Sequence, residues 1–193
     1  MTLKLPKEDR TEIPYVVPIT YRNLKKNYKS LAQVPLSDKA KALGQIFQKI
    51  SVGEMQPNGV GGVLMDGDMC MAFRGTGDQD MSTVYHFLVI PKNVPYIESI
   101  HDLDYNNSDH RQMINRMVTF AHSFCIKHGL DKEWPINMGF HNDPTVGYLH
   151  MHVLVGNLTV AGYNDRHRWV AVADVFELNP NPYQQVVLDV AKY

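Results

Sequence analysis

The sequence lacks most of the features that define secreted and membrane-spanning proteins. It contains only two cysteines, Cys70 and Cys125, and neither belongs to a closely spaced pair. A disulfide framework is therefore not expected, which favours a reducing, intracellular compartment. No apolar run approaches the roughly 18 residues that indicate a membrane-spanning helix. The first ten residues also lack the apolar stretch of a secretory signal.

The sequence also has no excess of charge of either sign. Its 19 basic and 20 acidic residues give a net charge of −1, so the chain has no general attraction for nucleic acid or for an anionic membrane. Any recognition of phosphate must then be local. We expect a cytoplasmic protein, with the nucleus as the alternative compartment, and neither a membrane nor a nucleic acid as its partner.

The length of 193 residues suits one sizeable core with terminal extensions. Residues 1–36 are rich in proline and lysine and are predicted to be an N-terminal extension. The regular hydrophobic patterns fall within residues 37–157, which we expect to form the domain. Residues 158–193 are predicted to be a C-terminal extension or arm.

Two segments have the apolar periodicity of amphipathic helices. Ser37 can cap the first, in which apolar side chains recur at helical spacing as far as Ile50, just before Gly53. Ser108 can cap the second, which ends near His128. These are the two main helices that the sequence predicts.

Short apolar runs bounded by turn residues predict an antiparallel sheet. The runs expected to form strands lie at residues 61–65, 69–73, 84–90, 136–140 and 146–155, and further strands or an arm are expected at 169–176 and 185–190. The predicted fold class is therefore α+β, with a sheet of about five strands and two main helices.

Two histidines, His150 and His152, stand two residues apart in the fifth of these predicted strands. Because side chains alternate between the two faces of a strand, Leu149 and Met151 would enter the core, whereas Tyr148, His150 and His152 would share the opposite face. Imidazole suits nucleophilic attack, proton transfer or metal ligation near neutral pH. Taken alone, the pair is consistent with half of a metal site, with a nucleophile and its helper, or with two structural histidines.

Four segments, in this order, resemble the histidine triad superfamily and most closely its Hint branch. Residues 46–54 resemble the opening helix and turn of that family, and residues 71–73 resemble its second strand. Residues 86–92 read HFLVIPK, close to its HxLVIPK segment. Residues 148–154 match its HxHxHxx motif, with a tyrosine in place of the first histidine. The resemblance spans about residues 40–157 and implies the HIT-like fold.

The resemblance implies a nucleotide hydrolase or nucleotidyl transferase. In this family the middle histidine attacks the α-phosphate of a nucleoside phosphoramidate or a dinucleotide polyphosphate, and water or another acceptor resolves the nucleotidyl-histidine intermediate. His150 matches that nucleophile. A main-chain carbonyl orients it in relatives, and Tyr148 still supplies this group. His152 matches the histidine that helps the leaving group to depart.

The same resemblance implies substrate-binding roles for further residues. His86 matches a histidine beside the nucleophile, Asn137 a polar residue at the phosphate or leaving group, and Thr145 a serine near that leaving group. The acidic residue that binds ribose in relatives is missing from its usual place, so Asp78 is the candidate replacement, with Asp80 as an alternative. Without the resemblance, His86 would be a core histidine, Asn137 a sheet-end residue and Thr145 the start of a strand.

Many relatives carry a structural zinc ion, whose ligand positions correspond here to Gln45, Gln48, Val94 and Tyr148. None of these is a usual zinc ligand. We therefore expect no metal and no cofactor. The resemblance also implies a homodimer, with a nucleotide or nucleotide conjugate as the ligand.

Two alternative functions remain open. The chain could be a non-catalytic nucleotide-binding or interaction module on the same fold, or a metal-dependent enzyme that uses His150, His152 and His86. The other histidines are expected to be surface or cap residues; they are His101, His110, His122, His128 and His141.

Overall fold

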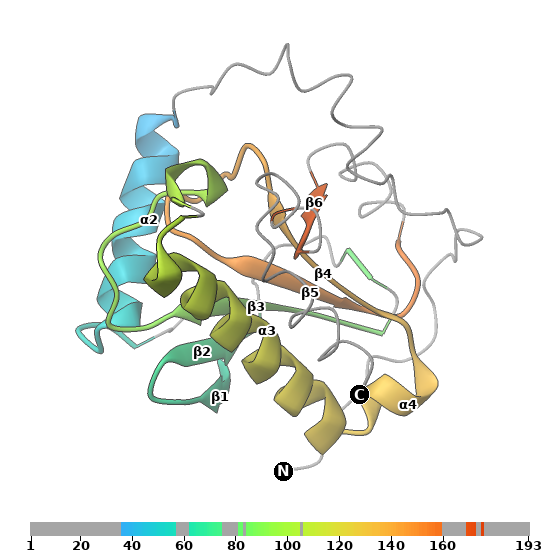
Figure 1. Cartoon of the computed structure of the whole chain (residues 1–193). Helices are drawn as coiled ribbons and strands as arrows, with labels where there is room; N and C mark the ends of the chain where they lie inside the picture. The colour runs from blue at the N-terminus through green and yellow to red at the C-terminus, as the bar shows by residue number, and fades with distance from the viewer. Residues whose placement is uncertain are drawn as a thin grey trace.

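A computed structural model shows a β-sheet with one main helix on each face (Figure 1). The structure describes residues 36–56, 62–74, 81–82, 84–104, 106–159, 169–172 and 175. Several expectations fall wholly or partly outside this set: residues 1–35 of the N-terminal extension, Asp78 and its alternative Asp80, most of the C-terminal extension, and the strand at 185–190.

The sheet has six strands in the order β1-β2-β3-β5-β4-β6, and each neighbouring pair is antiparallel. The strands are β1 (Val63–Asp66), β2 (Cys70–Phe73), β3 (Tyr85–Pro91), β4 (Ile136–His141), β5 (Met151–Val155) and β6 (Trp169–Ala171). The α+β class with an antiparallel sheet is thus confirmed. Because β6 pairs with β4, the sheet gains a sixth strand and continues beyond residue 157.

The two main helices begin close to where the capping residues predict. α2 (Asp38–Ser51) starts after Ser37, whose side chain accepts a hydrogen bond from the Ala40 N–H. α3 (Ser108–Lys127) is capped one residue earlier than predicted, because the side chain of Asn107 accepts the N–H of Asp109. His128 forms the C-cap of α3, as expected.

Two further short helical segments lie among the described residues. They are the 3₁₀ segment η1 (Ile100–Asp102) and α4 (Leu130–Glu133). No helix in the described ranges has the length and apolar character needed to cross a lipid bilayer.

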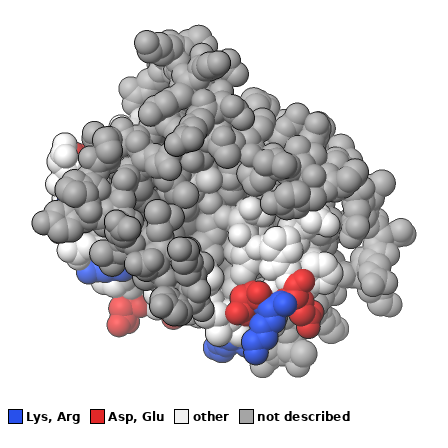
Figure 2. Space-filling view, turned by 45° about the vertical axis from the view of Figure 1, so that its right-hand side comes forward, with Lys and Arg blue, Asp and Glu red and all other residues white. Residues whose placement is uncertain are grey.

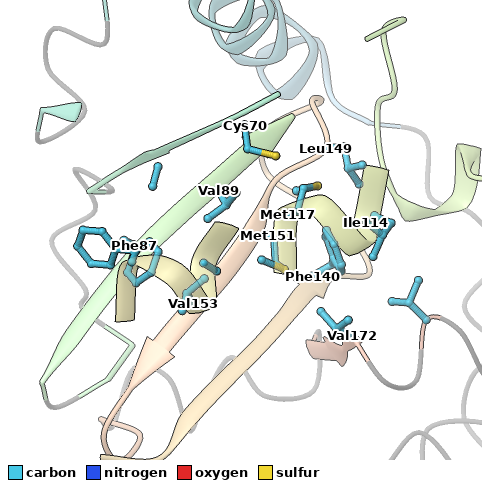
Figure 3. Close-up of a cluster of buried hydrophobic side chains, with 14 of the residues drawn as sticks. Cys70, Phe87, Val89, Ile114, Met117, Phe140, Leu149, Met151, Val153 and Val172 are labelled. Carbon is cyan, nitrogen blue, oxygen red and sulfur yellow. The ribbon is translucent and has the colours of Figure 1, made fainter. Parts of the chain in front are cut away.

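The main hydrophobic core lies between the sheet and α3, as Figure 3 shows. Phe87 and Val89 enter it from β3, and Met151 and Val153 enter it from β5. Met117 packs against them from α3. The expected alternation of β5 is therefore confirmed, and the histidines of the motif are left on the other face of the sheet.

On that other face, α2 covers the β2 and β3 part of the sheet. Phe47 and Ile50 of the helix form a second cluster with Phe73, Leu88 and Tyr148. The rest of this face, over β5, β4, β6 and the start of β3, carries the residues of the candidate site. Helix α3 thus packs on the face of the sheet opposite the site, and α2 lies beside the site on the same face.

Candidate active site

The approach to β5 differs from the predicted strand over residues 146–155. β5 begins at Met151, so His150 lies immediately before it. The reason is that main-chain donors upstream bond outside the sheet. The Gly147 N–H donates to the Ala40 carbonyl of α2 at 2.8 Å, and the Leu149 N–H donates to the Ile97 carbonyl at 2.8 Å. Main-chain hydrogen bonds at Gly147 and Leu149 therefore fix the chain before His150, and strand β5 fixes the chain after it.

The His150 ring is fixed in one protonation state and one tautomer. Its Nδ1 lies 2.7 Å from the main-chain carbonyl oxygen of Tyr148. Because a carbonyl can only accept, Nδ1 carries a proton, so Nε2 has the lone pair whenever the ring is neutral. Burial lowers the pKa of His150 to about 4; the bond to Tyr148 opposes this shift, while the charges of His141 and His86 add to it. Among the described residues, none makes a hydrogen bond to Nε2 of His150.

The structure brings His86 and His152 together with His150. His152 Nδ1 lies 3.0 Å from His86 Nε2, so one of these nitrogens donates and the other accepts. The two rings are nearly parallel, at an interplanar angle of 17°. The ring centroids of His150 and His152 are 5.0 Å apart. The three imidazoles thus form one continuous group on the face beside α2.

His141 belongs to the same group, which corrects the expectation of a surface or cap residue. Its side chain is only 8% exposed, and its ring centroid lies 4.1 Å from that of His152. The signal is present in the sequence, since Asn137, Gly139 and His141 alternate along β4 and must share a face. The strand predicted from the apolar run stops one residue short of His141.

Trp169 of β6 borders the four histidines on the side away from β5. Its indole centroid lies 6.1 Å from His152 and 6.4 Å from His141, in edge-to-face arrangements. The sequence predicted a strand here, but no pattern near Trp169 indicates a role in a site. Its position follows from the pairing of β6 with β4, in which His141 stands opposite Trp169.

The other candidate residues are less closely grouped. Asn137 shares the face of the histidines, but Leu154 stands between it and His86 in the strand pairing. Thr145 is exposed in the loop between β4 and β5. Asp78 lies outside the described residues.

The residues at the positions of the family's structural zinc do not fit a metal ion. Tyr148 is 1% exposed, and its hydroxyl donates toward Ser51 Oγ at 3.0 Å and the Pro91 carbonyl at 3.2 Å. Val94 packs against the main core. Within the described ranges, no group of three or more His, Cys, Asp or Glu side chains is arranged to hold a metal. These hydrogen bonds of Tyr148 link the end of α2 to the end of β3.

A comparison with known protein families identifies the family of this chain. The model of the family described as "Scavenger mRNA decapping enzyme C-term binding" matches residues 44–167, which is well over half of the chain. The chain belongs to this family. Since its domain is HIT-like, the resemblance to the histidine triad superfamily is confirmed for this scavenger decapping family member.

Solved structures are similar to this chain at low sequence identity. "Hnt3 in complex with DNA and guanosine" is 15% identical, with a TM-score of 0.50, and the match covers 74% of this chain and 80% of that one. A histidine triad protein from Clostridium difficile is 22% identical, with a TM-score of 0.46 and coverage of 58% and 90%. A HIT family hydrolase from Legionella pneumophila Philadelphia 1 is 23% identical, with a TM-score of 0.43 and coverage of 56% and 89%.

Proposed function

We propose that this scavenger decapping family member is a nucleotide hydrolase or nucleotidyl transferase. Its substrate is a nucleoside phosphoramidate or a dinucleotide polyphosphate, and its nucleophile is Nε2 of His150. The observation that carries the proposal is the 2.7 Å bond between His150 Nδ1 and the Tyr148 carbonyl. It fixes the tautomer, and because burial keeps the ring neutral, Nε2 has the lone pair that attack on phosphorus requires.

The proposed reaction has two steps. In the first, Nε2 of His150 forms a bond to the α-phosphorus, and the bond from phosphorus to the leaving nitrogen or oxygen breaks. His152 donates a proton to the departing atom, helped by its hydrogen bond with His86. In the second step, water attacks the phosphorus and loses a proton to His152, and the N–P bond breaks. The products are a nucleoside monophosphate, the protonated leaving group and the original His150.

His141 supports a role for this face in binding phosphate. It adds a fourth imidazole beside His152, and imidazoles can stabilise negative charge that develops on phosphoryl oxygens. Asn137, Thr145 and Asp78 remain candidates for contacts with the phosphate, the leaving group and the ribose. Each can be tested as a single alanine variant by its effect on KM.

A small nucleotide conjugate fits the charge of the chain better than a nucleic acid. The net charge is −1, and Figure 2 shows acidic and basic side chains next to one another among the described residues on the face in view. A net charge near zero offers little general attraction for a polyanion. The Hnt3 protein is seen in complex with DNA and guanosine. From that complex we carry over to this chain only the binding of a nucleoside. The homodimer and the cytoplasmic location expected from the sequence remain part of the proposal.

The test is turnover followed by detection of the intermediate. The protein is incubated with a nucleoside phosphoramidate and, separately, with a dinucleotide polyphosphate, and release of mononucleotide is measured. We expect His150→Ala to lose activity by on the order of 10³-fold or more. His122→Ala, a histidine of α3 on the opposite side of the sheet, is the matched control. Intact-protein mass spectrometry of acid-free quenched samples should show a nucleotidyl adduct that requires His150.

The alternatives give different results in the same experiments. Nucleotide binding without turnover and without an adduct would replace this proposal with the non-catalytic module. Turnover that is lost on treatment with a chelator and restored by a metal ion would support the metal-dependent enzyme.

A further inference from the structure

We propose that Trp169 selects the leaving group, so that the preferred substrates carry a planar aromatic ring on the group that departs. An aryl amine or a second nucleoside base would meet this requirement. The inference rests on the proposed function and names the class of substrate for the same site.

The indole of Trp169 occupies the space that a side chain at Gly139 would need. A Cβ atom added at Gly139 would come within 2.5 Å of Trp169 Cε2 and 2.6 Å of Cζ2. One part of the ring system is thus packed on the main chain of β4. Trp169 is nevertheless only partly buried, and a ligand held beside His152 would meet the exposed part of the indole.

The ring contacts place Trp169 on the leaving-group side of the nucleophile. Phe47 of α2 packs against His150, with centroids 5.8 Å apart. Trp169 packs instead against His152 and His141. In the proposed reaction His152 gives its proton to the departing atom. A group that leaves from the vicinity of His152 therefore departs next to the indole and away from Phe47.

The residues around Trp169 suit a planar ring of the ligand better than a saturated chain. Its described neighbours, His141 and His152, are themselves planar, and Gly139 presents no side chain. Aromatic side chains stack readily on bases and other π systems, largely irrespective of which base is present. Such a contact is made equally in the bound substrate and in the transition state, so it should lower KM and leave kcat unchanged.

The experiment compares two substrates that differ only in the planarity of the leaving group. Both are phosphoramidates of the same nucleoside monophosphate; one carries benzylamine and the other carries cyclohexylmethylamine. We expect Trp169→Leu to lower kcat/KM for the benzyl substrate by about tenfold, equivalent to ~1.4 kcal/mol, through a rise in KM. For the saturated substrate the change should be under about threefold, and Trp169→Phe should retain most of the preference.

The matched control is Trp134→Leu, which alters the other tryptophan of the chain. Trp134 is exposed at the C-cap of α4, outside the strands that carry the histidines of the site. This variant should behave like the unaltered protein with both substrates. Equal losses for the two substrates in Trp169→Leu, or no loss for either, would overturn the proposed selectivity while leaving the proposed function intact.

A binding measurement keeps the inference testable if no substrate is turned over or if Trp169→Leu does not fold. In Trp134→Phe, Trp169 is the sole tryptophan, so its fluorescence reports directly on the site. Quenching by the benzyl phosphoramidate and not by its saturated counterpart would support stacking on Trp169. Equal responses to the two compounds, or no response to either, would refute it. Absence of turnover with selective quenching would contradict the proposed function alone.

Discussion

Tyr148→Phe separates the structural role of the phenol from the catalytic role of the main chain at the same residue. The variant keeps the ring and removes the hydroxyl, which donates toward Ser51 Oγ and the Pro91 carbonyl. The carbonyl that orients His150 belongs to the main chain and is unchanged. We therefore expect a loss of stability with little loss of activity.

The magnitude follows from one buried hydroxyl. Ser51 Oγ still donates to the Gln48 carbonyl at 2.7 Å after the substitution, so no donor is stranded, and only acceptors lose their partner. Removing such a bond lowers the free energy of unfolding by about 1 to 2 kcal/mol. For a domain of this size the melting temperature should fall by roughly 2 to 8 °C. kcat/KM for a nucleoside phosphoramidate should stay within about threefold of the starting value.

Urea unfolding and steady-state turnover provide the two measurements. A double-mutant cycle with Ser51→Ala assigns the effect to this contact, because the two losses should be less than additive by about 0.5 to 1 kcal/mol. If Tyr148→Phe lost more than about tenfold in kcat/KM with unchanged stability, the phenol itself would take part in the reaction. The structural and catalytic roles of Tyr148 would then not be separate.

Two further predictions concern the nucleophile and the loop before it. Because burial lowers the pKa of His150 to about 4, kcat/KM should not fall as pH drops through 6.5, and its acid limb should lie near pH 4. The unfolded chain takes up a proton at His150 below about pH 6.5 that the folded chain refuses until about pH 4. Proton uptake by the unfolded chain at His150 therefore costs no stability well above pH 6.5. Between pH 7 and pH 5 it should lower the free energy of unfolding by about 2 kcal/mol. Urea unfolding of His150→Gln should lack this pH dependence. Gly44→Ala should destabilise the protein by about 2 kcal/mol or more and reduce activity, because its Cβ would lie 2.0 Å from the Gly147 carbonyl oxygen. Gly53→Ala is the control for Gly44→Ala, since a Cβ at Gly53 meets nothing within 4 Å. Only the positive φ of 78° adds strain there, which costs about 1 kcal/mol. Equal losses of activity in both variants would contradict a specific contact between α2 and the loop.

Local patterns predicted the elements well because they depend on neighbours along the chain. The cap at Ser37 and the apolar spacing behind it located α2, and alternation along 149–155 separated the core side chains from the histidines. The start of β5 was misplaced because main-chain donors at Gly147 and Leu149 bond to segments distant in sequence. No local pattern reports such partners.

The candidate site was predictable only in part. His86, His150 and His152 were chosen from the sequence, and the structure places them in contact. His141 was missed although the alternation of β4 pointed to it, since its strand was ended one residue too early. Trp169 could not have been found, because its place beside His152 depends on the pairing of β6 with β4 across nearly thirty residues.

The sequence by itself determined which side chains share a strand face, because this follows from a two-residue repeat. That the Tyr148 carbonyl holds Nδ1 of His150 is seen only in the structure. The tertiary structure alone decided which strands are neighbours. The order β3-β5-β4-β6 brings His86, His141 and Trp169 around His152, and packing against α2 buries the Tyr148 hydroxyl between Ser51 and Pro91. Side-chain direction is a local property of the backbone, whereas strand order is set by the free energy of burying whole faces together.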